Sequence, residues 1–549
     1  MKIPRFIACL TALLCMAAGC RSEDDAAVRA LARRIIPEHE KQFRFERLTD
    51  TTECFELESR GSKIVVRGNS SASIAVGLNH YLKNYCLTTV SWHACNPVEM
   101  PAVLPRIDEK VRVESRARER FFLNYCTFGY TMPWWGWTEW ERFIDWMALQ
   151  GVTMPLAITG QEAVWQRVWT RLGLSDEEVR AYFTGPAHLP WHRMSNIDRW
   201  QGPLPEEWID GQLALQQRIL ARERELGMKP VLPAFAGHVP QELKRLHPDA
   251  RITRVSYWGG FDDRYRCSFL DPMDPLFAVI QREFLTEQTR LFGTGHIYGA
   301  DPFNEIDAPT WDPETLAGMS RHIYESMAEV DPEAVWLQMG WLFYADPTHW
   351  TAENIRAFLG AVPQDRLLML DYFCEFTEIW KQTEKFHGQP YLWCYLGNFG
   401  GNTMLSGNFH TVSARMEDAF AHGGDNLRGV GSTLEGFGVN QFMYEFVLDK
   451  AWNTGIADDE WIARLADRRT GFRDPAARTG WRTLCDSVYT LPAQTGQSPL
   501  TNAHPALEGN WHWTTKPTTG YRFPTLWRVW EELLAVDSER DTYRFDVVN

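Results

Sequence analysis

Two glutamates that directly follow strand-like segments are the residues of this chain best suited to chemistry. Glu305 ends the run HIYGADPFNE after an apolar stretch at 296–300, and Glu435 follows the run GVGSTL. Two facing carboxyl groups suit glycoside cleavage, because one protonates the departing oxygen while the other attacks the sugar or activates water. The chain holds 71 acidic residues, and Glu305 also fits an ordinary surface turn, so the elements around the pair must decide.

Further polar and aromatic side chains are candidates for holding a substrate at the same place. An amide beside Glu305 can hold a sugar 2-substituent, a loop histidine can donate to a hydroxyl, and indole faces can wall a sugar-sized pocket. Each has a structural alternative: a loop hydrogen bond for an amide, and ordinary packing for a cysteine, histidine or tryptophan. The candidates are Asn124, Cys126, Trp191, His238, Asn304, Trp341 and Trp393.

Eight strand-like segments alternate with helical segments between residues 119 and 456. Continuous apolar strands separated by helices indicate a parallel sheet covered on both faces. Their number, and the lack of a Gly-x-Gly-x-x-Gly turn, favour a closed (β/α)8 barrel of the α/β class over an open sheet. The expected strands are 121–127, 152–158, 229–235, 296–300, 335–339, 366–371, 390–396 and 427–432.

This strand count has a consequence for the candidate chemistry. It places Glu435 after the eighth strand, at the same edge of the sheet as Glu305. After the first strand, Thr138 and Glu141 have the spacing of a capping box, and Gly151 is expected to end that helix.

Smaller units flank the barrel on both sides. Residues 20–118 form a small α/β domain, in which Lys63–Arg67 predicts a strand and Ser70 is expected to open a helix. Residues 457–549 predict an all-α domain with helices over 460–469, 481–489 and 526–534 and a polar loop at 493–520. This last domain is short and is either reduced or incomplete.

The amino-terminal segment 1–19 has the features of a signal peptide. Lys2 and Arg5 precede an apolar run at 6–19, shorter than the roughly 20 residues of a membrane span. Small residues before Cys20 resemble a bacterial lipoprotein cleavage box, which predicts lipidation of Cys20; ordinary cleavage after residue 19 is the alternative. The acidic tether RSEDD resembles a surface-export signal. We therefore expect a bacterial envelope protein, periplasmic or on the cell surface, held to the membrane by its lipid anchor only.

Composition excludes several classes of function. The net charge of -15 argues against nucleic-acid partners, whereas 25 Trp and 30 Phe are compatible with glycan binding. No P-loop, His-Glu-x-x-His or Cys-x-x-Cys motif occurs, so no cofactor or metal is expected. The 11 cysteines show no disulfide pattern, although Cys86 and Cys95 are close enough in sequence to pair in an oxidising compartment. The oligomeric state stays open.

Several long runs carry a resemblance that covers nearly the whole chain. The runs are NYCTFGYTMPWWGWTEWERFIDWMALQGVTMPLAITGQEAVW, VLPAFAGHVP, HIYGADPFNE, AVWLQMGWLF, YLWCYLGNFGGN and GSTLEGFGVNQFMYE. They resemble, in the same order, the α-N-acetylglucosaminidases of glycoside hydrolase family 89. The resemblance implies a small α/β domain, a barrel and a helical domain, and it implies that Glu305 is the acid/base and Glu435 the nucleophile. Related retaining barrels usually carry the nucleophile after the seventh strand, so one of the expected strands is open to reinterpretation.

The resemblance also implies a stereochemical course. In an α-linked N-acetylglucosamine the 2-acetamido group lies on the side of the leaving group and cannot attack from behind, so the enzyme must supply its own nucleophile. We therefore expect a retaining double displacement, with Glu435 ionised and Glu305 protonated at the start. An inactive glycan-binding lipoprotein and a hexosaminidase of other anomeric specificity remain alternatives. The natural glycan, mucin-type or heparan-type, is not decided, although the acidic surface disfavours a polyanion.

Overall fold

The computed structural model describes residues 25–93, 98–400, 405–491 and 519–548. The signal segment 1–19, Cys20, Cys95 and nearly all of the polar loop expected at 493–520 lie outside these ranges. Among the helices within the ranges, none has both the length and the apolar character that crossing a bilayer requires.

The amino-terminal domain is a four-stranded sheet with two helices. Its strands lie in the order β1-β3-β2-β4, with β1 parallel to β3 and the other pairs antiparallel. The Ser70 hydroxyl accepts the Ser73 N–H at the start of α3, so the expected helix start is confirmed. The elements are α2 (Ala26–Ile35), β1 (Phe43–Arg47), β2 (Cys54–Arg60), β3 (Lys63–Gly68), α3 (Ser71–Asn84) and β4 (Val111–Glu114).

The central domain is a barrel of eight parallel strands that follow one another in chain order. A parallel bridge between Leu156 and Val231 joins the two end strands of the sheet and closes it. Two strands are only two residues long and end in proline, which has no N–H for the ladder. The strands are β5 (Glu119–Phe122), β6 (Met154–Pro155), β7 (Leu232–Pro233), β11 (Ile297–Gly299), β12 (Val335–Met339), β13 (Leu367–Asp371), β14 (Tyr391–Tyr395) and β15 (Leu427–Ser432).

Each of the eight expected segments contains a strand, so the (β/α)8 prediction is confirmed, and Glu435 does follow the eighth strand. The bounds expected for the first strand, 121–127, are wrong, because β5 ends at Phe122 and Thr127 already begins α4. The predicted capping box is wrong. Helix α5 (Trp137–Gln150) begins two residues earlier than that box requires, with Gly136 as its N-cap, and Glu139 accepts the Gly136 N–H at 3.0 Å. Gly151 ends the helix in the left-handed conformation, as expected.

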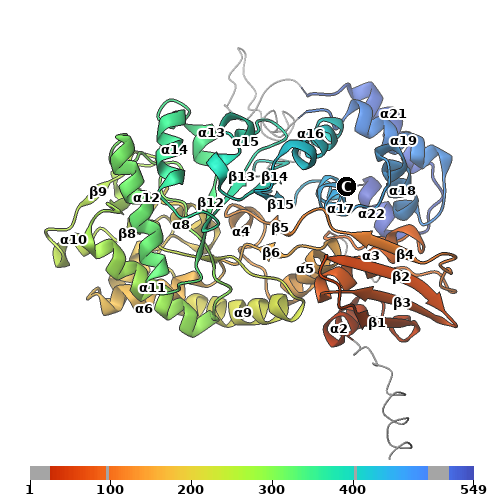
Figure 1. Ribbon diagram of the computed structural model, residues 1–549, viewed down its shortest axis with the longest axis horizontal. Coiled ribbons are helices and arrows are strands. Elements are labelled where there is room, and N and C mark those ends of the chain that lie inside the picture. Colours follow the sequence, from red (N-terminus) through yellow and green to blue (C-terminus); the bar gives the residue numbers. More distant parts are fainter. Residues whose placement is uncertain (1–24, 94–97, 401–404, 492–518, 549) are drawn as a thin grey trace, which may run out of the picture.

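The helices of the barrel lie outside its strands (Figure 1). Two connections between successive strands are long: the one between β6 and β7 carries four α-helices, and the one between β7 and β11 carries a small antiparallel sheet, β8-β10-β9. The elements are α4 (Thr127–Tyr130), α6 (Gln161–Arg171), α7 (Asp176–Tyr182), α8 (Leu189–Arg193), α9 (Glu206–Glu225), β8 (His238–Val239), α10 (Leu243–Leu246), β9 (Ile252–Arg254), β10 (Ser268–Leu270), α11 (Pro275–Phe292), α12 (Pro313–Ala328), α13 (Trp341–Ala345), α14 (Ala352–Gly360), α15 (Ile379–Gln382), α16 (Phe409–His422) and α17 (Phe442–Lys450).

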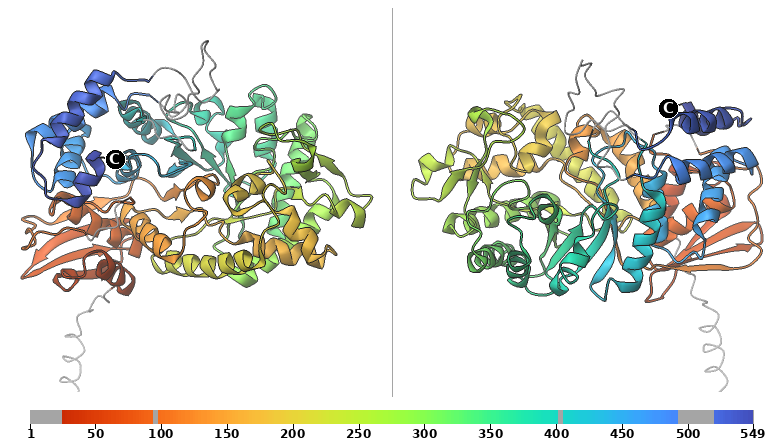
Figure 2. Two further views of the ribbon diagram at one scale, coloured as in Figure 1. Left: turned by 180° about the vertical axis from the view of Figure 1, so that it is seen from behind. Right: turned by 90° about the horizontal axis from the view of Figure 1, so that it is seen from above.

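The carboxy-terminal part is helical, as expected, and lies against the amino-terminal domain. In all views the blue helices stand beside the red sheet on one side of the barrel (Figures 1 and 2). Arg464 of α18 donates to the Asn84 side chain at 3.1 Å across this contact. The helices are α18 (Asp458–Thr470), α19 (Pro475–Ser487), α21 (Phe523–Leu534) and α22 (Asp541–Val548).

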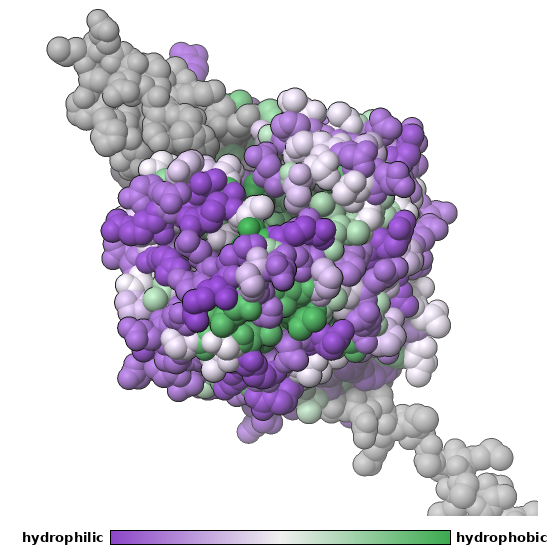
Figure 3. Space-filling model, turned by 90° about the vertical axis from the view of Figure 1, so that its left-hand side faces the viewer, coloured by the Kyte–Doolittle hydropathy of each residue, from purple (hydrophilic) through white to green (hydrophobic). Residues whose placement is uncertain are grey.

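The far side of the barrel, away from both flanking domains, carries a mainly hydrophilic surface with an apolar patch near its centre (Figure 3). The barrel core itself is fully buried, with Phe122, Trp336 and Tyr391 at 0% exposure. Such a core fixes the carboxyl ends of all eight strands at one edge, which is where (β/α)8 enzymes place their chemistry.

Candidate active site

Glu305 and Glu435 reach the same end of the barrel from opposite strands. Glu305 follows β11, the fourth strand, and Glu435 follows β15, the eighth. Burial, and to a smaller extent the charge of Glu305, raise the pKa of Glu435. Burial, together with the charges of both glutamates, raises the pKa values of Cys126 and Tyr130, which follow β5. The two carboxylates and these two side chains therefore form one cluster, as the sequence-based pairing of the glutamates requires.

Glu435 is half-buried, and its surroundings disfavour its charge. Burial, and to a smaller extent Glu305, raise its pKa to about 7, although the backbone N–H of Gly400 donates to its Oε2 and lowers the pKa. Burial therefore opposes the expected ionised state of Glu435 and favours its protonated form as the pH falls toward 7. The physical reason is desolvation, which penalises the charged form of a carboxyl group.

The loop that carries Glu435 is held by hydrogen bonds from neighbouring strand ends. The Asn124 side chain donates to the Thr433 carbonyl at 2.7 Å, and Thr127 donates to the Leu434 carbonyl at 2.6 Å. The Asn124 side-chain oxygen accepts the Cys126 N–H at 2.9 Å. Asn124 is thus buried and engaged at both ends, so its placement is that of a residue fixing the loop below Glu435.

Glu305 is exposed and is held by two donors. Asn196 Nδ2 donates to its Oε2 at 3.1 Å, and Trp258 Nε1 donates to the same oxygen at 3.0 Å. Beside it, Asn304 is buried, and its Oδ1 has no hydrogen-bond partner among the described residues. This free acceptor next to Glu305 is the position from which an amide would receive an N–H or O–H of a sugar 2-substituent.

The tryptophan candidates divide into two groups. Trp191 is half-buried and packs edge-on against Tyr130 with ring centres 5.1 Å apart, and Trp341 is half-buried beside Tyr372, 6.0 Å away. Tyr130 lies against Gly400, whose N–H donates to Glu435, and the Tyr372 carbonyl accepts from the Thr433 hydroxyl at 3.0 Å, two residues before Glu435. The two indoles therefore lie near the loop that carries Glu435.

Trp393, by contrast, is 0% exposed, and its Nε1 donates to Glu378 at 3.2 Å. The prediction that it walls a pocket is wrong, because the ring has no face open to a ligand. It is part of the packing of β14 against the surrounding helices.

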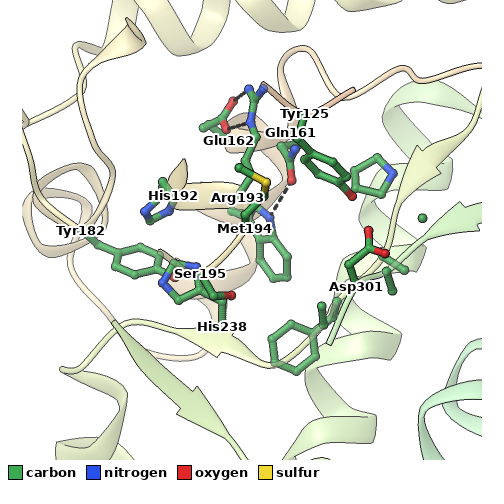
Figure 4. Close-up of a pocket in the computed structure, with 17 residues that line it drawn as sticks. Tyr125, Gln161, Glu162, Tyr182, His192, Arg193, Met194, Ser195, His238 and Asp301 are labelled. Atoms are coloured by element: carbon green, nitrogen blue, oxygen red, sulfur yellow. Dashed lines mark hydrogen bonds and ion pairs between the residues drawn. The ribbon is translucent and has the colours of Figure 1, made fainter. Parts of the chain in front are cut away.

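His238 lines a cavity beside α8 (Figure 4). Its Nε2 is 2.7 Å from Asp198 Oδ1, so that nitrogen is not available for a sugar hydroxyl. His192 Nδ1 lies 3.2 Å from the same oxygen, and the three ligand atoms fall within 4.8 Å of one another, a spacing that could hold a metal ion. In Figure 4 His192, Tyr182 and Ser195 gather on one side of the cavity, and Asp301 and Tyr125 lie on the other.

Sequence reasoning missed four residues of the site: Asn196, Trp258, Tyr130 and Gly400. Asn196 and Trp258 lie in the two long connections after β6 and β7, and no local pattern indicates that these loops fold back over the fourth strand. The role of Gly400 is visible only in the structure. A Cβ there would stand 1.6 Å from the Tyr130 ring, so the chain approaches too closely for any side chain.

Comparison with known families matches three consecutive parts of the chain. Residues 120–454 match the family described as the alpha-N-acetylglucosaminidase (NAGLU) tim-barrel domain. Residues 26–106 match the corresponding N-terminal domain, and residues 461–549 match the C-terminal domain. Human alpha-N-acetylglucosaminidase is 39% identical over 550 aligned positions, which cover 97% of this chain and 73% of the human protein.

Solved structures give a similar result. A family 89 glycoside hydrolase from Clostridium perfringens in complex with 2-acetamido-1,2-dideoxynojirmycin is 28% identical and superposes with a TM-score of 0.85. A variant from the same organism, in complex with its substrate GlcNAc-α-1,4-galactose, superposes equally well, with a TM-score of 0.85. Each match covers 95% of this chain but 59% of the Clostridium chain, so this chain spans less than two thirds of that protein.

Proposed function

Because this chain belongs to the alpha-N-acetylglucosaminidase family, we propose that it is a retaining exo-glycosidase that removes terminal α-linked N-acetylglucosamine from glycans. The observation that carries the proposal is the pair Glu305 and Glu435, two carboxylates that follow opposite strands of one barrel at its carboxyl end. A relative crystallised with GlcNAc-α-1,4-galactose supports the substrate class.

In the proposed first step, a Glu435 oxygen attacks the anomeric carbon, and the bond to the leaving oxygen breaks as Glu305 gives that oxygen its proton. The product is a glycosyl ester on Glu435. In the second step Glu305 takes a proton from water, the water oxygen attacks the anomeric carbon, and the ester bond breaks. Two inversions release α-N-acetylglucosamine and return both carboxyl groups to their starting states.

The electrostatics of Glu435 fit a nucleophile that is reactive once ionised. A carboxylate that burial holds at a pKa of about 7 is a poorly solvated anion, and the positive charge that develops on the sugar in the transition state stabilises it. The Gly400 N–H limits the pKa rise by donating to Oε2, which leaves the other oxygen free to attack. We therefore expect activity to fall as the pH drops below about 7, because Glu435 then takes up a proton.

Turnover of an activated aryl α-N-acetylglucosaminide tests the assignment. Glu435→Ala should abolish turnover, and azide should restore part of it by taking the place of the missing carboxylate. Asp331→Asn, at the other end of the barrel, is the matched control and should retain activity. Full activity in Glu435→Ala would refute the nucleophile assignment, and NMR of the first-released anomer would refute retention if it detects the β-anomer.

The same measurements separate the alternatives. An inactive glycan-binding protein would release no N-acetylglucosamine from any substrate, and a hexosaminidase of the other anomeric class would cleave the β-linked aryl glycoside instead. Mucin-type and heparan-type glycans are then compared directly. With a net charge of -15, we expect the uncharged GlcNAc-α-galactose cap to be cleaved in preference to a sulfated chain.

We also propose that the protein is anchored to the bacterial envelope by a lipid on Cys20, since small residues and then Cys20 follow the apolar run of a signal peptide. Metabolic labelling with a fatty acid should mark the wild-type chain, and Cys20→Ser should lose the label and be released from the membrane fraction. Labelling that persists in Cys20→Ser would refute this location.

A further inference from the structure

Two loops from separate connections meet on the same oxygen of Glu305. The first, residues 194–202, is here named the Asn196 loop; the second, residues 255–267, is named the Trp258 loop. Asn196 Nδ2 and Trp258 Nε1 both donate to Glu305 Oε2, at 3.1 and 3.0 Å. An oxygen that accepts two N–H donors is poorly placed to carry a proton, because a protonated carboxyl oxygen is itself a donor.

The two loops are tied together behind Glu305. The Asp198 N–H donates to the Tyr265 carbonyl at 2.9 Å, and Trp200 of the first loop packs edge-on against Phe261 and Tyr265 of the second, with ring centres 4.9 and 5.0 Å apart. The loops therefore move as one unit, and what fixes either of them fixes both donors to Glu305.

The Asp198 carboxylate is the centre of this unit. It is 2% exposed, and three side chains converge on its Oδ1: His238 at 2.7 Å, His192 at 3.2 Å and Cys267 Sγ at 3.4 Å. These contacts come from helix α8, from strand β8 and from the end of the Trp258 loop. A buried carboxylate with several donors holds its surroundings strongly, because each donor loses its partner if the carboxylate moves.

The Asn196 loop needs such a fixed point. Ser195, Arg199 and Gln201 have φ angles of 64°, 64° and 58°, left-handed conformations that non-glycine residues adopt only when the surrounding structure enforces them. Helix α8, which leads into the loop, is itself fixed by Arg193, which donates to both oxygens of the buried Glu162 at 2.8 Å.

We propose that Asp198 is a positioning residue for the acid/base. It fixes the two loops so that Asn196 and Trp258 both donate to Glu305 Oε2. The other oxygen, Oε1, then gives its proton to the leaving group and later takes one from water. This inference rests on the proposed function, in which Glu305 is the acid/base. It assigns the proton-transferring oxygen and names three residues, Asn196, Trp258 and Asp198, that act through Glu305.

If the two donors no longer fix Glu305, cleavage of one class of substrate should slow more than cleavage of another. Leaving groups that are poor, such as an alkyl or sugar hydroxyl, need a proton in the transition state, whereas dinitrophenolate departs without one. A variant that only weakens the fold or the sugar pocket slows both classes alike. The ratio of kcat/KM values for the two classes therefore reports on proton donation by Glu305, because kcat/KM covers the steps up to departure of the leaving group and not the later attack of water.

The test measures kcat/KM on the full chain for aryl α-N-acetylglucosaminides of graded leaving-group acidity and for an alkyl glycoside. Asp198→Asn, Asn196→Ala and Trp258→Phe should each lower kcat/KM for the alkyl glycoside by about tenfold or more, and for the dinitrophenyl glycoside by less than about threefold. The last two variants keep the Asp198 cluster, so they test the grip on Glu305 even if Asp198→Asn folds poorly.

The matched control is Asp331→Asn. Asp331 also accepts from a histidine, His296 at 2.8 Å, and from the Tyr298 hydroxyl at 2.7 Å, but it lies at the amino end of the strands. It should lose stability without changing the ratio. Equal losses for all leaving groups in the loop variants, or the same ratio change in the control, would overturn the inference. Glu305→Gln tests the proposed function separately from the role of the loops. If this variant shows no leaving-group dependence, the assignment of Glu305 as the acid/base has failed.

Discussion

Substitution of Gly400 tests directly how the backbone controls the pKa of the nucleophile Glu435, because no side chain fits at that position. Its N–H donates to Glu435 Oε2, and a Cβ would stand 1.6 Å from the Tyr130 ring. Tyr130 is itself packed edge-on against Trp191, so we expect the Gly400 loop to withdraw when the residue is changed to alanine. Glu435 would then lose a donor that favours its charged form.

The magnitude follows from the energy of that hydrogen bond. A hydrogen bond to a charged group contributes about 1.5–3 kcal/mol, and about 1.4 kcal/mol corresponds to one pH unit. Since the pKa of Glu435 is about 7 in the intact site, Gly400→Ala should move the acid limb of kcat/KM upward by about one to two pH units. Below that limb kcat/KM should fall by about 10- to 100-fold, and well above it the variant should approach the wild type.

The assay is a pH profile of kcat/KM with an activated aryl glycoside for three variants. Gly360→Ala, where a Cβ meets open space, is the matched control and should keep the wild-type limb. Gly400→Ala combined with Tyr130→Ala gives the new methyl group room, so the limb should return toward its original position whatever happens to the rate. A limb that stays near pH 7 in Gly400→Ala, with activity retained, would refute the role of this N–H.

Three further predictions concern buried groups. Glu375 is 1% exposed, and burial raises its pKa to about 7. Because the side chain of the unfolded chain ionises near pH 4.5, the free energy of unfolding should fall by about 3 kcal/mol between pH 4.5 and 7. Urea unfolding at pH 5 and 8 should show a smaller fall for Glu375→Gln than for the wild type. Trp393→Phe removes one hydrogen-bond donor to Glu378 and should lower the free energy of unfolding by about 1–3 kcal/mol with KM unchanged. A raised KM would instead indicate that Trp393 contacts the substrate. Asn124→Ala frees the Thr433 carbonyl, so kcat should fall without a matching rise in KM, whereas a rise in KM alone would indicate a sugar contact.

The barrel could be predicted from sequence because its strands carry a strong local signal. Continuous apolar runs at regular spacing require burial on both faces, and all eight expected segments form strands. The placement of Glu305 and Glu435 followed from the same pattern, since parallel strands bring their carboxyl ends to one edge. Both successes depend on periodicity and chain order alone.

The errors and omissions have a different cause. Apolar character does not tell which face of a strand a tryptophan occupies, so Trp393 could not be separated from a pocket wall until the position of Glu378 was known. The pKa of Glu435 depends on how deeply a loop is buried, which a sequence does not encode locally. Asn196 lies 109 residues before Glu305 and reaches it only through the folding of a long connection.

These observations indicate that the barrel supports its two carboxylates by different means. Glu435 is half-buried and is held by short loops of the adjoining strands, through the Gly400 N–H and the Asn124 side chain. Glu305 is exposed and is held from outside, by the two long connections that carry Asn196 and Trp258. A nucleophile must keep one fixed distance to the anomeric carbon, whereas an acid/base must also admit a leaving group and then water, so its support has to stand at the rim of the site. It follows that changes in the long connections should act on proton transfer, and changes in the short loops on attack at the sugar.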